Sequence, residues 1–207
     1  MIDSAGGWWV SGAGHCFPDG AVGSALNGQG GLYGQAVAVS FPDPDLALIG
    51  SSNRDYHRYT YVGLDPLAIR IIDGYRDIMQ VGENVCLTGA FTGFACNDIR
   101  VEDVGEELCD PGCTYDLYSV NEVFLGGEIT QDGDSGGPAI GRHGDDRASA
   151  RGTLVGGRGC EPSPPHACTT ALLHHMDTLM DEFGVQVAQA GGPGTGTPGG
   201  PPDQALD

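Results

Sequence analysis

The sequence predicts an all-β protein, built as a pair of antiparallel β-barrels or as a β-sandwich. The 207 residues include 36 glycines and 13 prolines, which favour short strands and turns over long helices. Short apolar or alternating runs lie between clusters of Gly, Pro, Asn and Asp along most of the chain. A chain of this length can bury one good-sized core, or a core divided between two small lobes.

Eight of these runs are expected to form strands. They are GWWVSG (7–12), QAVAVSF (35–41), LALIG (46–50), RYTYVG (58–63), LAIRIID (67–73), NVCLTG (84–89), YDLYSV (115–120) and GTLVGG (152–157).

One segment, TTALLHHMDTLMDEFG (169–184), has the period of a helix instead. One helical face holds Leu172, Met176, Leu179, Met180 and Phe183. Gly184 stands where a helix end favours a left-handed residue. The segment VQV (185–187) then predicts a last short strand. Residues 191–207 are rich in Gly and Pro and are expected to form a flexible tail after a domain at 1–190.

The charge of the chain is strongly negative. Asp and Glu number 28 against nine basic residues, which gives a formal net charge of -19. This charge argues against nucleic acid and anionic membranes as partners. Two interpretations remain open: a soluble acidic surface, or adaptation to high salt, in which ions screen the self-repulsion of the fold. No run of about 18 apolar residues could span a membrane, and the first residues do not resemble a signal peptide.

The segment TQDGDSGGPAIG (130–141) is the strongest sequence signal of chemistry, because it sets Ser135 between an aspartate and two glycines. A serine hydroxyl becomes a good nucleophile only when a neighbouring base, usually histidine, takes its proton. The candidate bases are His15, His57, His143, His166, His174 and His175. His174 and His175 are expected on the surface of the predicted helix. The other three after His15 are expected in polar loops or at strand ends.

His15 differs from the other histidines, because it closes the apolar run WWVSGAGHC with small residues just before it. A third member of a serine site should be a carboxylate that orients the histidine. Two aspartates compete for this role: Asp45 lies directly before the apolar run Leu46–Ile49, and Asp65 stands before Pro66 and a similar run.

The motifs AGHC, DLALI and GDSGGP, in this order, resemble those of the chymotrypsin-like serine proteases. The likeness is greatest to the secreted bacterial branch of the streptogrisins and α-lytic protease, and it covers residues 3–188. SFPDPDLALI resembles that branch's segment before the catalytic aspartate, VGENVCLTGAFTGFACNDI its cysteine-closed hairpin, and GTLVGGRGC the strand that walls its specificity pocket. The resemblance implies a trypsin-like fold of two six-stranded antiparallel β-barrels with one C-terminal helix.

The resemblance also implies a serine endopeptidase, a hydrolase that acts on protein or peptide substrates as a secreted monomer without metal or cofactor. Ser135 would be the nucleophile and His15 the general base and then acid. Asp45 would orient His15, and it is favoured over Asp65 because SFP precedes it, whereas Pro66 removes a backbone donor from the strand that should follow Asp65.

The residues around Ser135 also receive roles from the resemblance. The backbone N–H groups of Gly133 and Ser135 would form the oxyanion hole, and Asp134 would hold the loop by pairing inside the fold. The pocket wall would be Val155, Gly156 and Gly157.

The side-chain specificity is predicted from the residues that would line the pocket. The two glycines of the pocket wall leave the pocket mouth open, and the residues just before the serine loop, Ile129 and Thr130, place no carboxylate at the expected pocket floor. We expect a large apolar or aromatic residue on the acyl side of the cut bond. Arg158 would instead favour an acidic residue if it turns into the pocket. Val155 also departs from the family, which usually has at its position a serine that hydrogen-bonds the catalytic aspartate.

Six of the seven cysteines fall into three pairs that are close in sequence, whereas a zinc site would need more closely spaced pairs. The expected disulfides are Cys86–Cys96, Cys109–Cys113 and Cys160–Cys168. Disulfides indicate an oxidising compartment. Cys16 remains alone, although the family pairs it with an upstream cysteine. With only 14 residues before His15, we expect the first barrel to be truncated and in-frame upstream sequence to encode its missing strand.

Other functions stay open on the sequence alone. The chain could be a catalytically inactive trypsin-like domain, or a disulfide-stapled extracellular binding domain in which GDSGGP is coincidental. A serine hydrolase that acts on esters is a further alternative.

Overall fold

The computed structural model describes residues 1–4, 7–17, 24–26, 32–50, 59–62, 69–76, 79–96, 98–109, 112–123, 126–143 and 146–188. Asp65 and the expected tail at 191–207 lie outside these residues. The regular elements of the described part are almost all strands, in agreement with the predicted all-β, trypsin-like class. No helix among the described residues is long and apolar enough to cross a membrane.

A small antiparallel sheet carries the N-terminal half of the site. Its strands, in the spatial order β2-β5-β4-β3, are β2 (Val10–Gly12), β5 (Leu46–Gly50), β4 (Leu32–Ser40) and β3 (Ser24–Leu26). Every residue of β5 is buried, as expected for its uninterrupted apolar run. Because β2 pairs with β5, the residues that follow β2 lie beside those that precede β5.

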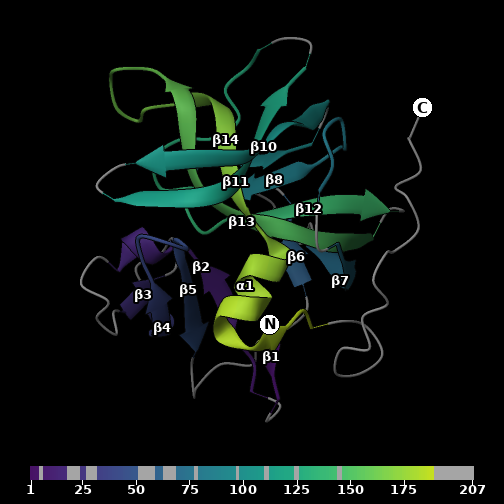
Figure 1. The fold of residues 1–207 in the computed structure, drawn as a ribbon. Coiled ribbons are helices and arrows are strands. Elements are labelled where there is room, and N and C mark those ends of the chain that lie inside the picture. The colour runs from purple at the N-terminus through teal and green to yellow at the C-terminus, as the bar shows by residue number, and fades with distance from the viewer. Residues whose placement is uncertain are drawn as a thin grey trace.

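Nine of the described strands form a second, larger sheet (Figure 1). They are β6 (Tyr59–Tyr61), β7 (Ile69–Tyr75), β8 (Cys86–Gly89), β9 (Gly93–Ala95), β10 (Ile99–Cys109), β11 (Cys113–Glu122), β12 (Pro138–His143), β13 (Arg147–Cys160) and β14 (Cys168–His175).

Most of this sheet curls into a barrel. The main path runs β10-β11-β14-β13-β12-β8-β9. The barrel closes between the start of β8 and the start of β10, where the backbone N–H of Val85 donates to the carbonyl oxygen of Ile99 at 2.9 Å. Val101 N donates to Glu83 O at 3.0 Å in the same seam. Closure leaves few unpaired edge groups.

The strands β6 and β7 belong to the larger sheet, so the described strands do not divide evenly into two six-stranded barrels. They pair with each other, and β7 lies parallel to β13 in the larger sheet. The small sheet therefore contains four strands among the described residues. Ile72 of β7 packs in the apolar layer between the two units.

The predicted helix is present but shorter than its sequence pattern indicates. Helix α1 spans Met176–Phe183 and ends at Gly184, whose φ of 61° is the left-handed conformation expected there. Residues 169–175 belong instead to β14, which is hydrogen-bonded to β11 on one side and β13 on the other. A central strand is buried on both faces, so its apolar residues need not alternate and can mimic a helical stripe.

The apolar core has two main parts, one inside the larger barrel and one between the two units. The barrel interior contains Tyr118, Ile99 and Leu173, among others. A second layer joins β5, through Leu46 and Leu48, to α1 and to β15 (Val185–Gln186), which pairs with β1 (Ile2–Asp3). Figure 1 shows α1 and β1 beside the junction of the two units.

Candidate active site

His15 and Asp45 lie together at the junction of β2 and β5. His15 belongs to a short 3-10 turn, η1 (Gly14–Cys16), directly after β2, and Asp45 immediately precedes β5. The backbone N–H of His15 donates to Asp45 Oδ1 at 2.7 Å, and His15 Nδ1 lies 2.7 Å from Asp45 Oδ2. One carboxylate thus binds both the backbone and the ring of the histidine, which leaves the ring little freedom to rotate.

The electrostatics of this pair favour a charged histidine. Asp45 is 3% exposed. Its hydrogen bond with the ring, followed by the interaction of the ring with the Cys16 side chain, raises the pKa of His15. The carboxylate therefore stabilises an imidazolium at this position. Such stabilisation is the role of the aspartate in a serine–histidine–aspartate triad.

Gly14 makes the close approach of the two segments possible. A Cβ atom at this position would overlap the carbonyl oxygen of Ser40 and lie 3.0 Å from the backbone nitrogen of Leu46. Only glycine allows η1 to approach the start of β5 so closely. The small residues before His15 in the sequence thus have a packing reason.

Ser135 lies, half-buried, in the loop that leads into β12. The loop is tied to β13, because Gly136 N donates to Leu154 O at 2.7 Å and Leu154 N donates to Gly137 O at 2.9 Å. Gly136 has a φ of 86°, and a Cβ there would lie 3.1 Å from the backbone nitrogen of Ala13. The residue after Ser135 therefore packs against the segment that leads into His15.

The side chain of Asp134 holds the serine loop in place through hydrogen bonds. It is 1% exposed, and its Oδ1 accepts the backbone N–H groups of Phe91 at 2.8 Å and Thr92 at 3.2 Å. Its Oδ2 accepts the Gln131 N–H at 3.0 Å and the Thr92 hydroxyl. The carboxylate thus connects the loop of Ser135 to the turn between β8 and β9.

The predicted pocket strand runs along β13. Val155 is 2% exposed and packs against Ala13 in a small apolar cluster, so its side chain offers no hydrogen bond to an aspartate. Leu108 of β10 covers the open side of Gly156, since a Cβ at Gly156 would lie 2.5 Å from Leu108 Cδ2. Gly157 faces Cys168. An apolar surface therefore borders this part of the strand.

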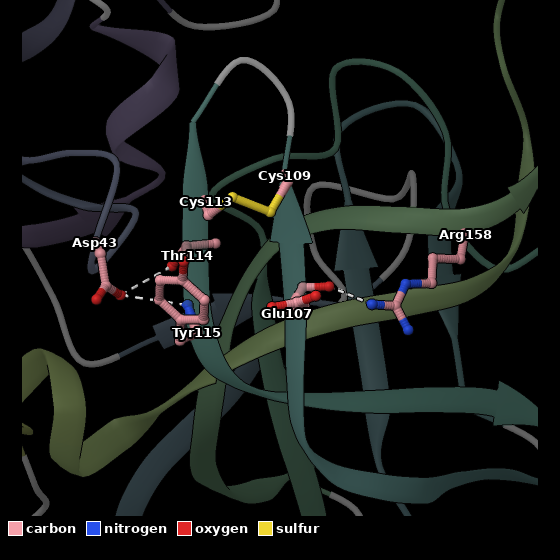
Figure 2. Close-up of a disulfide and its surroundings, with 7 residues drawn as sticks. All are labelled: Asp43, Glu107, Cys109, Cys113, Thr114, Tyr115 and Arg158. Atoms are coloured by element: carbon pink, nitrogen blue, oxygen red, sulfur yellow. Dashed lines mark hydrogen bonds between the residues drawn. A yellow bond between two sulfur atoms is a disulfide. The ribbon is translucent and has the colours of Figure 1, made fainter.

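Arg158 does not lie free beside these glycines. Its guanidinium donates to the Glu106 carboxylate and to the backbone oxygen of Glu107, both on β10. Figure 2 shows Arg158 of β13 reaching to Glu107 on β10. The positive charge that would attract an acidic substrate residue is thus already paired with a carboxylate.

The tip of the β10–β11 hairpin connects the larger sheet to the segment before Asp45. Asp43 accepts hydrogen bonds from Thr114 Oγ1 at 3.4 Å and from the backbone N–H of Tyr115 at 3.3 Å, beside the Cys109–Cys113 disulfide (Figure 2). Gly112 packs on Pro42. The hairpin tip therefore fixes the chain two residues before the aspartate.

His174 is the site residue that sequence reasoning missed. It was expected on the surface of a helix, whereas it is fully buried near the end of β14, with 0% of its surface exposed. Its Nε2 accepts the backbone N–H of Asp45 at 3.0 Å and lies 2.9 Å from Thr114 Oγ1. No local pattern could have found this contact, because 129 residues separate the two partners.

The three disulfides formed in the structure are those that the cysteine spacing predicts. They are Cys86–Cys96, Cys109–Cys113 and Cys160–Cys168. The first closes the hairpin that Asp134 holds, and the third links β13 to β14 beside the pocket strand. Cys16, next to His15, is free and exposed.

Comparison with known proteins agrees with the motifs. No family model matches the chain. The chain is 26% identical to streptogrisin-C of Streptomyces griseus over 196 residues, which cover 92% of this chain and 36% of that protein. It therefore spans little more than a third of the length of this curated relative.

Solved structures share the fold at lower identity. A glutamic acid specific serine protease, described as using a histidine triad in substrate binding, is 20% identical with a TM-score of 0.70, and 90% of each chain is covered. Nocardiopsis protease is 20% identical with a TM-score of 0.66, covering 88% of this chain and 86% of that one. An alpha-lytic protease homolog is 22% identical with a TM-score of 0.63, covering 87% and 86%. These likenesses show that the chain shares the trypsin-like, all-β fold of these bacterial serine proteases.

Proposed function

We propose that this protein is a serine endopeptidase that cleaves peptide bonds through Ser135, His15 and Asp45. The observation that carries the proposal is the double hydrogen bond of His15 to the buried Asp45 carboxylate, next to a serine loop that packs on the residues before His15. A histidine fixed in this way has one ring nitrogen bound to a carboxylate, which leaves Nε2 as the atom that would exchange a proton.

The reaction would run in two halves. Ser135 Oγ attacks the carbonyl carbon of the substrate while His15 Nε2 takes the hydroxyl proton, and the carbonyl π electrons move to the oxygen. The C–N bond then breaks, and His15 returns the proton to the leaving amine. Water repeats the sequence on the acyl-enzyme and releases the acid product with Ser135 restored.

The oxyanion would be held by the backbone N–H groups of Gly133 and Ser135. Losing one donor of this kind typically lowers the rate by about 10²–10³-fold. Support comes from the way the loop is held, because the buried Asp134 fixes it through four hydrogen bonds and Gly136 fixes it to β13. A preorganised loop is what this kind of stabilisation requires.

For specificity, we propose a large apolar or aromatic residue on the acyl side of the cut bond, with Val155, Gly156 and Gly157 along the substrate. Leu108 provides an apolar surface over Gly156, and the Arg158 charge is engaged by Glu106. Protein or peptide would be the substrate. The three disulfides support an oxidising environment outside the cytoplasm.

An active-site serine probe tests the proposal. Incubation with a biotinylated phenylalanine diphenyl phosphonate should label Ser135, as located by mass spectrometry of a peptide digest. Ser135→Ala should abolish labelling, and Ser119→Ala serves as a matched control, because Ser119 is a buried serine on β11.

Three outcomes separate the alternatives. Labelling of Ser135 with peptide cleavage supports the endopeptidase. Labelling with turnover of esters but not of peptides would favour an esterase. A folded protein that is not labelled and cleaves neither substrate would contradict the proposal and favour a binding domain.

A further inference from the structure

His174 is a buried titratable group for which the proposed reaction has no use. It lies at the junction of the two sheets, and burial lowers its pKa to about 4. The ring is therefore neutral at neutral pH. Three carboxylates face it, Asp43 and Asp45 from the segment before β5 and Asp116 from β11, and each raises its pKa, whereas the adjacent His175 lowers it.

The hydrogen bonds of His174 define which ring nitrogen carries the proton. A backbone N–H can only donate, so the Asp45 N–H at 3.0 Å requires a lone pair on His174 Nε2. The proton of the neutral ring is therefore on Nδ1. The Thr114 hydroxyl, 2.9 Å from the same Nε2, can donate to it as well.

The other ring nitrogen of His174, Nδ1, shows that a histidine at this position has a cost in stability. Nδ1 is buried and has no hydrogen-bond partner among the described residues. A buried donor without a partner destabilises the fold, and an apolar side chain of similar size would avoid that penalty. Such a side chain, however, would leave the Asp45 N–H without its acceptor.

We propose that His174 is a positioning residue, which holds the Asp45 carboxylate against His15 by accepting the backbone N–H of Asp45. The inference rests on the proposed function. Asp45 comes from the small sheet, whereas His174 and the loop of Ser135 come from the larger one. The hydrogen bond at His174 therefore fixes the aspartate and its histidine relative to the unit that carries the serine.

A second contact supports this interpretation. Asp43 is held by Thr114 and Tyr115 of β11, so the segment before β5 is bound to the larger sheet at residues 43 and 45. Movement of this segment would move Asp45, and with it the ring of His15. Small displacements of catalytic groups reduce turnover steeply.

The first experiment compares two variants at one position. His174→Leu keeps the volume and removes the acceptor, whereas His174→Gln supplies an amide oxygen that accepts and does not titrate. We expect His174→Leu to lower kcat about 10- to 100-fold with KM within about twofold, as for a misplaced catalytic group. His174→Gln should recover most of kcat.

Leu173→Ala is the matched control. Leu173 precedes His174 on β14, is fully buried and packs into the barrel interior instead of against Asp45. It should lower Tm at least as much as His174→Leu while kcat stays close to that of the wild type. Equal losses of kcat in the two variants, or no loss in His174→Leu, would overturn the proposal.

The second experiment needs neither a variant nor enzymatic activity. In the ¹H–¹⁵N spectrum of the wild-type protein, the Asp45 amide should move together with the ring-carbon protons of His174 as the pH falls through about 4. His174→Gln should remove that step. An Asp45 amide that ignores the titration of the ring would contradict the proposal even if the variants do not fold. A wild-type protein without peptidase activity but with this coupling would contradict only the proposed function.

Discussion

Asp134→Asn is the sharpest test of how the serine loop is held. The carboxylate accepts four hydrogen bonds, two at each oxygen. An asparagine of the same shape keeps one carbonyl oxygen, which can still serve Phe91 and Thr92, but it places an NH₂ group against the N–H of Gln131. The hydroxyl of Thr92 can rotate to accept, whereas the Gln131 N–H cannot.

The number of hydrogen bonds affected sets the expected loss of folding stability. One hydrogen bond to a charged group is removed, worth about 1.5–3 kcal/mol, and the remaining ones lose their charge. We therefore expect about 2–4 kcal/mol of lost stability, measured by urea unfolding with an unchanged m-value. If half of this free energy is expressed in the geometry of the proposed oxyanion loop, kcat falls about 5- to 30-fold, because 1.4 kcal/mol is a factor of ten.

Asp132→Asn is the control for this experiment. Asp132 is an exposed acid in the same loop, and its replacement removes the same charge two residues away. It should change stability by less than about 0.5 kcal/mol. Equal effects of the two substitutions would refute the reasoning, since they would show that charge and not hydrogen bonding is responsible. An Asp134→Asn protein as stable and active as the wild type would refute it as well.

Asp45→Asn should reduce kcat by about 10⁴-fold, because the amide favours the wrong tautomer of His15; Asp65→Asn should be mild, and the reverse result would reassign the aspartate. The pKa of His15 is raised, so kcat/KM should fall on acidification with a midpoint above 6.5, which gives an alkaline optimum. Stability should change with pH in the opposite direction to kcat/KM. The stability that the charged His15–Asp45 pair contributes is fully present below about pH 6.5 and is lost as the pH rises through the raised pKa of His15. A peptide library should show apolar or aromatic residues before the cut; Arg158→Ala should leave that preference unchanged, and dominant cleavage after Arg would exclude it.

Much of the fold could be predicted from local patterns. The apolar run after Asp45 became the buried strand β5, Gly184 ended the helix in the left-handed conformation, and cysteines within ten residues of each other formed disulfides. Each of these features depends on neighbours along the chain. The approach of His15 to Asp45 could also be predicted, because the motifs pointed to both residues.

Tertiary structure alone determined the rest. Residues 169–175 have a helical pattern, yet they form β14, because hydrogen bonds to β11 and β13 outweigh local periodicity. Two partners of Asp134, Phe91 and Thr92, lie more than 40 residues away in the sequence, and the acceptor of the Asp45 N–H is 129 residues distant. A buried polar group takes whichever partner the packed fold brings to it. The sequence by itself therefore pointed to the residues that are proposed to carry the chemistry, and only the fold determined what holds them.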